Sequence, residues 1–272
     1  MKVLSINEKS YEELKLPEII YKYRHWNDPF HKTIMTNREV YFAKPSSFTD
    51  PFDCKIPIRY DLLSDVDIYN HYLFVSKEKY ENWSRQRHRA FAREWARKSL
   101  IKDSDFVNKQ QKKEFDEYNE CSGILSLTEN ISNLDMWKCY SDDHKGFAVG
   151  FDPLIMFKYL GCGGRKVIYY DELPIVYPRP KHSFEAQLYL QNFSKLRIWE
   201  FEEEYRAIKF NPNPMSDNER IIKIPAYAYK EIIFGAKMDE SVKDDFRKSI
   251  PFELENVPIK QARFNNDKIE ID

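Results

Sequence analysis

The feature that most constrains the fold is a long stretch, residues 76–120, that contains neither proline nor glycine. Trp83, Phe91 and Trp95 recur within it near helical spacing. Because proline and glycine are the residues least compatible with a helix interior, their absence predicts helices here. The segments on either side show strand-like alternation instead. We therefore expect a helical insertion at 76–120 within a chain that is otherwise rich in strands.

The remaining segments alternate between the two periodicities. Apolar and polar residues alternate with a period of two in the segments that we predict as strands, which are 19–26, 39–43, 123–127, 146–151, 165–170, 204–210, 220–224 and 229–234. The predicted helices are 31–36, 134–140, 184–196 and 240–249. Together they predict an α+β fold, with a single domain over 1–272, a mixed and largely antiparallel β core and the helical insertion.

The charges of the whole chain nearly cancel, with 43 basic and 44 acidic residues. No overall field therefore directs it to nucleic acid or to an anionic membrane. The middle of the insertion is locally basic, and Glu94 is the opposing acid there. A solvated helix face and a surface for phosphate groups both explain this pattern. The basic residues are Arg85, Arg87, Arg89, Arg93, Arg97, Lys98 and Lys102.

The sequence also bears on location. Residues 1–15 include no apolar run of signal-peptide length. No later stretch approaches the roughly 20 apolar residues that a membrane span requires. The four cysteines are widely spaced and do not form the dense framework of small secreted domains. We expect a cytoplasmic protein without a membrane partner.

A first group of candidate functional residues lies on the first predicted strand. Alternation places Tyr21 and Tyr23 on one face and Lys22 and Arg24 on the other. Two cations on one strand suit an anionic ligand, because the Arg guanidinium matches the geometry of phosphate. A predicted loop at 45–53 contains Asp50 and Asp53. An ion pair between Arg24 and one of these acids explains the presence of the arginine equally well.

A second group follows the insertion. Ser126 and Thr128 end a predicted strand, and their hydroxyls can bond a ribose or an amide, or simply cap the strand. Trp137 and Tyr140 lie about one helical turn apart and either pack in the core or stack on a ligand. His144 can act as an acid or a base because its ordinary pKa lies near neutrality.

The third group is the acidic run that ends at Arg206. If this run is a strand, Glu202, Glu204 and Arg206 share one face. Two carboxylates side by side are unfavourable unless a ligand, a metal or a cation compensates their charge. If the run is instead the end of a helix, the acids form a solvated rim.

Taken in chain order, these segments resemble the bacterial family called domain of unknown function 2971. The resemblance covers most of the chain, from Tyr21 to about Gly235. It rests on residues 21–24, 48–53 and 136–146, on Lys195 with Trp199, and on Glu202, Glu204, Tyr205 and Arg206. Membership of this family implies no particular reaction.

The same residues also resemble ADP-ribosyltransferases that use an Arg, a Ser-containing strand and a Glu in that order. This likeness implies NAD as the substrate, with Arg24 on a phosphate and with Ser126 and Thr128 beside the nicotinamide ribose. The implied catalytic residues are Glu204, which stabilises the developing positive charge on the ribose, and Glu202, which orients or deprotonates the acceptor. The full set of predicted cofactor-binding residues is Tyr23, Arg24, Ser126, Thr128, Trp137, Tyr140, His144 and Arg206.

The expected function is therefore an NAD-dependent, ADP-ribosyltransferase-like activity, of the kind that serves as a toxin or a phage-defence effector. Its acceptor is an unidentified protein or nucleic acid. A metal-dependent nuclease or phosphodiesterase is one alternative, with Mg²⁺ on Asp50, Asp53, Glu202 and Glu204, although no compact motif such as HExxH is present and no resident metal is expected. A non-catalytic sensor of a nucleotide-like small molecule is the other.

Overall fold

The computed structural model of the chain describes residues 16–162, 164–266 and 268–272. The opening residues 1–15, on which the signal-peptide prediction depends, lie outside this range. The described chain divides into two compact units. Unit 1 comprises 16–44, Cys121–Val167 and Arg197–Asp272, and unit 2 comprises Pro45–Glu120 and Ile168–Leu196. The single-domain organisation stays a prediction.

Unit 1 contains an eight-stranded mixed sheet, which confirms the predicted α+β fold. Its strands are β1 (Ile20–Arg24), β3 (Ser122–Thr128), β4 (Phe147–Phe151), β5 (Gly164–Lys166), β8 (Glu204–Phe210), β10 (Tyr229–Phe234), β11 (Ile259–Asn265) and β12 (Lys268–Ile271). The order across the sheet is β12-β11-β10-β4-β1-β3-β8-β5. Its pairs are antiparallel apart from β10 with β11. A separate antiparallel pair joins β2 (Glu39–Tyr41) to β9 (Ile221–Lys223).

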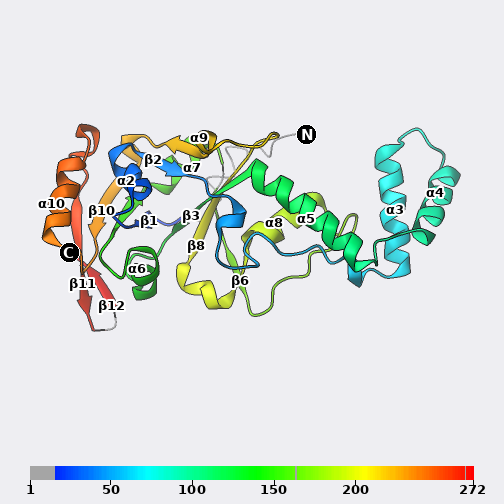
Figure 1. Cartoon of the computed structure of the whole chain (residues 1–272), viewed down its shortest axis with the longest axis horizontal. Helices are drawn as coiled ribbons and strands as arrows, with labels where there is room; N and C mark the ends of the chain where they lie inside the picture. The colour runs from blue at the N-terminus through cyan, green and yellow to red at the C-terminus, as the bar shows by residue number, and fades with distance from the viewer. Residues whose placement is uncertain (1–15, 163, 267) are drawn as a thin grey trace. The chain divides into compact units, whose positions relative to one another are not determined.

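The helices of unit 1 begin at well-defined caps. They are α2 (Pro29–Thr36), α6 (Leu134–Tyr140), α7 (Pro153–Leu160), α9 (Asp217–Arg220) and α10 (Glu240–Ser249), with short 3-10 segments η3 (Arg197–Glu202), η4 (Ala226–Ala228) and η5 (Phe252–Leu254). Asp28, Asn133 and Asp152 cap α2, α6 and α7 by accepting bonds from main-chain N–H groups of the first turn. Figure 1 shows α10 beside the β10 end of the sheet.

The two faces of the sheet are covered by different helices. On one face, Ile20 and Phe147 pack in a cluster that includes Ile34 and Met35 of α2. On the other, Tyr23 belongs to a cluster with Met136 and Trp137 of α6. We call these the α2 face and the α6 face. Since successive side chains of a strand point to opposite faces, these clusters fix the direction of every polar side chain between them.

Unit 2 is mainly helical. It contains α3 (Asp65–Lys79), α4 (Arg85–Arg97), α5 (Ser104–Cys121), α8 (Phe184–Phe193), η1 (Pro45–Ser47), η2 (Tyr60–Leu62) and the parallel pair β6 (Ile168–Tyr170) with β7 (Ser194–Leu196). The helices α3 and α4 lie side by side (Figure 1). Tyr80 stacks on Trp83 at 3.9 Å between ring centroids, and Trp83 contacts Phe91 at 5.9 Å. Trp83 and Phe91, whose spacing in the sequence predicted helices, thus pack where α3 and α4 meet.

Several elements differ from the sequence prediction for identifiable reasons. The helix α7 was not predicted, although it begins directly after β4 with Pro153 in its first turn, where the missing N–H costs nothing. The predicted strand 165–170 is divided between β5 and β6, and the predicted helix 184–196 ends at Phe193 before β7. The predicted insertion starts too late, because α3 begins at Asp65. None of the described helices is long and apolar enough to cross a membrane.

Candidate functional site

The central strands β1 and β3 pair at a single position. Tyr21 lies opposite Thr128, whereas β1 pairs with β4 along its whole length. Beyond Tyr21, β1 therefore has no strand partner on its β3 side among the described residues. Lys22 reaches across this separation, where its Nζ donates a hydrogen bond of 2.5 Å to the main-chain oxygen of Ser126. The separation of the two strands thus gives a β1 side chain access to β3.

Hydroxyl and charged side chains meet on the next pair of strands. In the antiparallel register of β3 and β8, Thr128 lies opposite Glu204 and Ser126 lies opposite Arg206. These residues alternate with Leu127 and others of the α2-face cluster, so all four point to the α6 face. Cross-strand neighbours of this kind have Cβ atoms about 5 Å apart. The structure therefore brings the predicted Ser126, Thr128, Glu204 and Arg206 together.

Glu204 and Arg206 form a buried, bidentate ion pair. Arg206 Nε donates to Glu204 Oε1 at 2.7 Å, and Arg206 Nη2 donates to Glu204 Oε2 at 2.8 Å. Glu204 is 4% exposed and Arg206 is 0% exposed. Two parallel charge-assisted bonds compensate much of the cost of burying these charges. The solvated rim that the sequence left open is therefore wrong for Glu204.

Glu202 occupies a different element from Glu204. It ends the 3-10 segment η3, and Glu203 then takes a left-handed conformation with φ of 41° before β8 begins. The prediction that Glu202 shares a strand face with Glu204 and Arg206 is therefore wrong for Glu202. Glu202 is nevertheless buried, and it accepts a short hydrogen bond from the Tyr140 hydroxyl of α6. Burial, together with the charge of Glu202, raises the pKa of Tyr140.

Besides Arg206, Lys22 is a second cation within electrostatic reach of these acids. Burial and the nearby Arg24 lower the pKa of Lys22 well below its ordinary value, and the charges of Glu204 and Glu202 oppose that shift. Groups from four distant segments thus gather in unit 1. We call them the polar cluster, which consists of Lys22, Ser126, Thr128, Tyr140, Glu202, Glu204 and Arg206. Sequence reasoning paired Lys22 with Arg24 as cations suited to an anionic ligand, but it assigned the phosphate to Arg24 alone.

Arg24 makes different contacts from Lys22. Alternation along β1 directs both side chains to the α2 face, opposite to the side chains of Glu204 and Arg206. Its Nη1 donates to the main-chain oxygen of Tyr23 at 3.1 Å. Burial lowers the pKa of Arg24 to about 10, and Asp28 at the start of α2 opposes this shift. Lys22 differs from Arg24 because its Nζ reaches Ser126 O across the separation of β1 and β3, where the charges of Glu204 and Glu202 act on it.

Tyr23 and Trp137, both assigned to the cofactor from the sequence, are core residues. Their rings meet edge to face at 4.9 Å. The Tyr23 hydroxyl donates to Asn130 O at 2.8 Å, and Trp137 Nε1 donates to Ile131 O at 2.7 Å. Because Trp137 is fully buried and its N–H is satisfied, it has no free surface on which a ligand can stack. The role that the structure gives to both residues is packing.

His144 is also buried, in a left-handed turn. Asp142, Asp143 and His144 have φ values of 51°, 50° and 70°. The His144 ring lies 4.8 Å from that of Phe264, and its Nδ1 has no hydrogen-bond partner in the described parts of the chain. Burial, followed by the charge of Lys237, lowers the pKa of His144. A neutral imidazole packed in a turn is thus a poorer proton donor than the sequence suggested.

Unit 2 holds its own charged groups. Lys195 pairs with Asp53 at 3.4 Å, and both are buried. Asp50 accepts a bond from the main-chain N–H of Phe52 at 2.9 Å, as expected of a turn. The nuclease alternative needs Asp53 and Asp50 from this unit. Asp53 is the ion-pair partner of Lys195, and Asp50 stabilises a turn.

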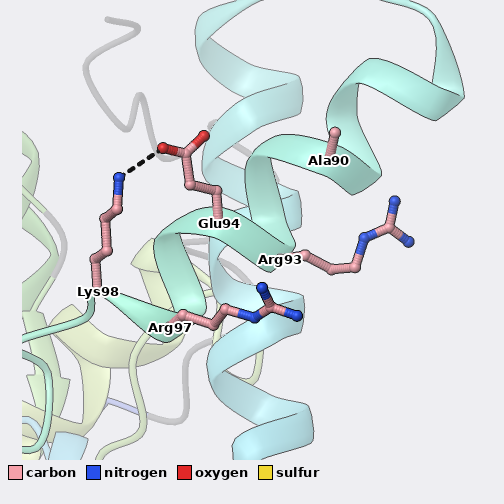
Figure 2. Close-up of a pocket in the computed structure, with 5 residues that line it drawn as sticks. All are labelled: Ala90, Arg93, Glu94, Arg97 and Lys98. Atoms are coloured by element: carbon pink, nitrogen blue, oxygen red, sulfur yellow. Dashed lines mark hydrogen bonds and ion pairs between the residues drawn. The ribbon is translucent and has the colours of Figure 1, made fainter.

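The helix α4 carries an open hollow on its basic face (Figure 2). Glu94 accepts a bond of 2.8 Å from Lys98, while Arg93 and Arg97 extend from the helix beside them. The hollow measures about 330 Å³ and is lined by Ala90, Arg93, Glu94, Arg97 and Lys98. A smaller hollow of about 150 Å³ lies around His71 and Pro178. Solvation and phosphate binding both remain explanations of the α4 surface.

Comparison of the chain with family models, curated proteins and solved structures finds no match in any of the three. The resemblance to domain of unknown function 2971 and to ADP-ribosyltransferases thus stays a prediction. The case for a function depends on the polar cluster itself.

Proposed function

We propose that the polar cluster of unit 1 is the site of an NAD-dependent, ADP-ribosyltransferase-like enzyme. The observation that carries the proposal is the β3–β8 register, which sets the hydroxyls of Ser126 and Thr128 directly beside Arg206 and Glu204. The second carboxylate, Glu202, lies close enough for its charge to act on the same lysine as Glu204 does. Hydroxyls, carboxylates and a cation are the groups that a nicotinamide ribose and its phosphates require.

The chemistry follows from these groups. The bond between ribose C1′ and the nicotinamide nitrogen breaks, and its electron pair leaves with neutral nicotinamide. Positive charge then develops on the ribose, and the Glu204 carboxylate stabilises it while accepting a ribose hydroxyl bond. Arg206 keeps Glu204 ionised and fixed, because a bidentate partner favours the charged form.

The other members of the cluster have complementary roles. Glu202 accepts the proton that the acceptor loses as its oxygen or nitrogen bonds to C1′. Tyr140 orients Glu202 through its hydroxyl. Lys22, which already donates to Ser126 O, offers its ammonium to a phosphate of NAD at the separation of β1 and β3. A transfer of this kind to a cellular protein or nucleic acid suits a toxin or a phage-defence effector acting in the cytoplasm.

The test compares two buried carboxylates of the same sheet. Glu204→Gln is measured against Glu231→Gln, since Glu231 is also buried, accepts a bond from Tyr21 at 2.9 Å and pairs with Lys260 at 2.6 Å. Each purified variant is incubated with NAD and a cell lysate, and the released nicotinamide and the labelled macromolecules are quantified. We expect Glu204→Gln to lower release by roughly 100-fold or more and Glu231→Gln to leave it within a few-fold of wild type.

Two results would separate the alternatives. Stabilisation of the folded protein by NAD without any nicotinamide release favours the sensor. Turnover of a nucleic acid that needs Mg²⁺ and proceeds without NAD favours the nuclease. If calorimetry detects no NAD binding to folded wild-type protein, the proposal is wrong. Circular dichroism of each variant shows whether a loss of activity reflects a loss of fold.

A further inference from the structure

A second group of chemically versatile side chains lies at the junction of β1 and α2. His25 follows β1, Asp28 is the N-cap of α2 and His31 lies in the first turn of that helix. All three are partly buried, and one potential ligand atom of each lies within 4.8 Å of the others. The spacing is His-x-x-Asp-x-x-His, which sequence reasoning passed over because it matches no compact metal motif.

The local backbone explains why these side chains converge. Asp28 Oδ1 accepts the main-chain N–H groups of Phe30 at 2.7 Å and His31 at 3.2 Å, which fixes the carboxylate. Its Oδ2 makes no hydrogen bond within the described residues. The rings of His25 and His31 lie 4.3 Å apart at 74°. The cap thus holds the carboxylate within reach of two imidazoles that already meet.

The hydrogen bonding of the imidazoles leaves them available. His31 Nδ1 accepts a long bond of 3.4 Å from the His25 main-chain N–H, at the weak end of the hydrogen-bond range. A metal ion can compete for such a lone pair. The nearby Arg24 disfavours metal binding, because its positive charge repels a cation. The carboxylate of Asp28 offsets that repulsion.

We propose that His25, Asp28 and His31 form a binding site for a divalent transition-metal ion, with Zn²⁺ as the first candidate. Two imidazoles and one carboxylate suit Zn²⁺ better than Mg²⁺ or Ca²⁺, which prefer oxygen ligands. With bonds of about 2.0–2.1 Å in a tetrahedron, the ligand atoms lie roughly 3.3 Å apart, so side-chain rotations within the present cluster bring them together.

The bound ion would close the turn between β1 and α2. Three protein ligands leave a fourth position for water, so the affinity is lower than that of closed four-ligand structural sites. Binding to the folded state alone stabilises it by mass action. This site is independent of the proposed NAD chemistry, because none of its three residues belongs to the polar cluster.

The experiment uses the full chain after chelator treatment, titrated with Zn²⁺ in calorimetry and with Co²⁺ in visible absorption. Asp28→Asn is the sharpest variant, because Asn caps helices as well as Asp but lacks the charged oxygen. Asp152→Asn is its control, since Asp152 caps α7 through Ile155 N at 3.0 Å. We expect Zn²⁺ affinity to fall by roughly 10-fold or more in Asp28→Asn and to stay within about 2-fold in Asp152→Asn.

A histidine pair gives the second comparison. His31→Gln is matched with His182→Gln, because His182 Nδ1 also accepts a main-chain N–H, from Tyr177 at 3.2 Å. The proposal predicts that His31→Gln abolishes the Co²⁺ absorption band of a nitrogen-ligated ion and that His182→Gln retains it. It is overturned if the wild-type chain shows no saturable Zn²⁺ binding, or if Asp28→Asn and His31→Gln bind as tightly as their controls.

Discussion

Two ion pairs, one in each unit, show how differently the same charges behave. In unit 1, Glu204 and Arg206 are two residues apart on a strand, and their side chains are 5% and 1% exposed. In unit 2, Glu94 and Lys98 are four residues apart on a helix, with side chains 61% and 67% exposed. The first pair has neighbours on an adjacent strand, whereas the second lies open to water on α4 (Figure 2).

The difference shows that burial decides what a local charge pair does. A desolvated pair interacts strongly, but each partner depends on the other. An exposed pair is screened and contributes little. Both patterns look like short runs of charge in the sequence. Only the pair that the sheet buries beside hydroxyls belongs to the proposed site.

The largest effect should come from breaking the buried pair. Arg206→Met leaves the Glu204 carboxylate buried without its guanidinium, so we expect a loss of about 3–5 kcal/mol in the free energy of unfolding, measured in urea. The double variant Arg206→Met with Glu204→Gln should recover part of this loss, because no buried charge is then left over. If Arg206→Met lowers the free energy of unfolding no more than Glu94→Gln does, the buried and the exposed ion pair do not differ in their contribution to stability.

A smaller effect is expected where the polar cluster meets α6. Tyr140→Phe removes the hydroxyl that donates a hydrogen bond to Glu202. We expect the free energy of unfolding to fall by about 1–2 kcal/mol. Tyr159→Phe is the control, because Tyr159 is half exposed on α7. The urea midpoints of the two variants give the comparison. Equal midpoints would mean that the Tyr140 bond contributes nothing to the cluster.

The pH dependence of unit 1 offers a further test through His144. Its folded pKa lies below the ordinary value of 6.5 because it is buried, so the unfolded state takes up a proton first. Stability contributed by the neutral ring is present above pH 6.5 and is lost as the pH falls toward the folded pKa. Asn tolerates the left-handed turn, so His144→Asn should fold and lose less stability between pH 7 and pH 5. Parallel stability curves for the two proteins would contradict this.

The smallest effect belongs to the exposed pair. Glu94→Gln on α4 should change the free energy of unfolding only slightly in low salt, and the difference from wild type should shrink as salt is added. Thermal unfolding at two ionic strengths measures this. A loss of stability as large as that of Arg206→Met would show that α4 is not a solvated face.

Local pattern predicted much of this fold. The bounds of α6, β8, β10 and α10 agree with the sequence because each carries a clear period and ends at a turn or cap. The terminal strands β11 and β12 were missed. They are exposed over much of their length, so their sequence lacks a continuous apolar face.

The candidate site was only partly predictable. The sequence shows which residue types are present, but it does not show how the strands pair. Glu204 and Arg206 were placed correctly on one strand face because alternation along the strand suffices, and the β3–β8 register adds Ser126 to that face. Glu202 was misplaced because a left-handed Glu203 precedes the strand. The phosphate was assigned to Arg24 rather than to Lys22 because nothing in the sequence shows that β1 leaves β3 after one residue pair.

The most direct test of the proposed site is the rate of nicotinamide release from NAD in the presence of lysate, followed by proton NMR. Wild type is compared with Lys22→Met and with Lys230→Met, whose lysine pairs with Asp152 at 3.1 Å on a different strand. We predict release by wild type and by Lys230→Met, and a rate lower by roughly 10-fold or more in Lys22→Met. NAD that stays intact with folded wild-type protein, or release that Lys22→Met leaves unchanged, would contradict the account.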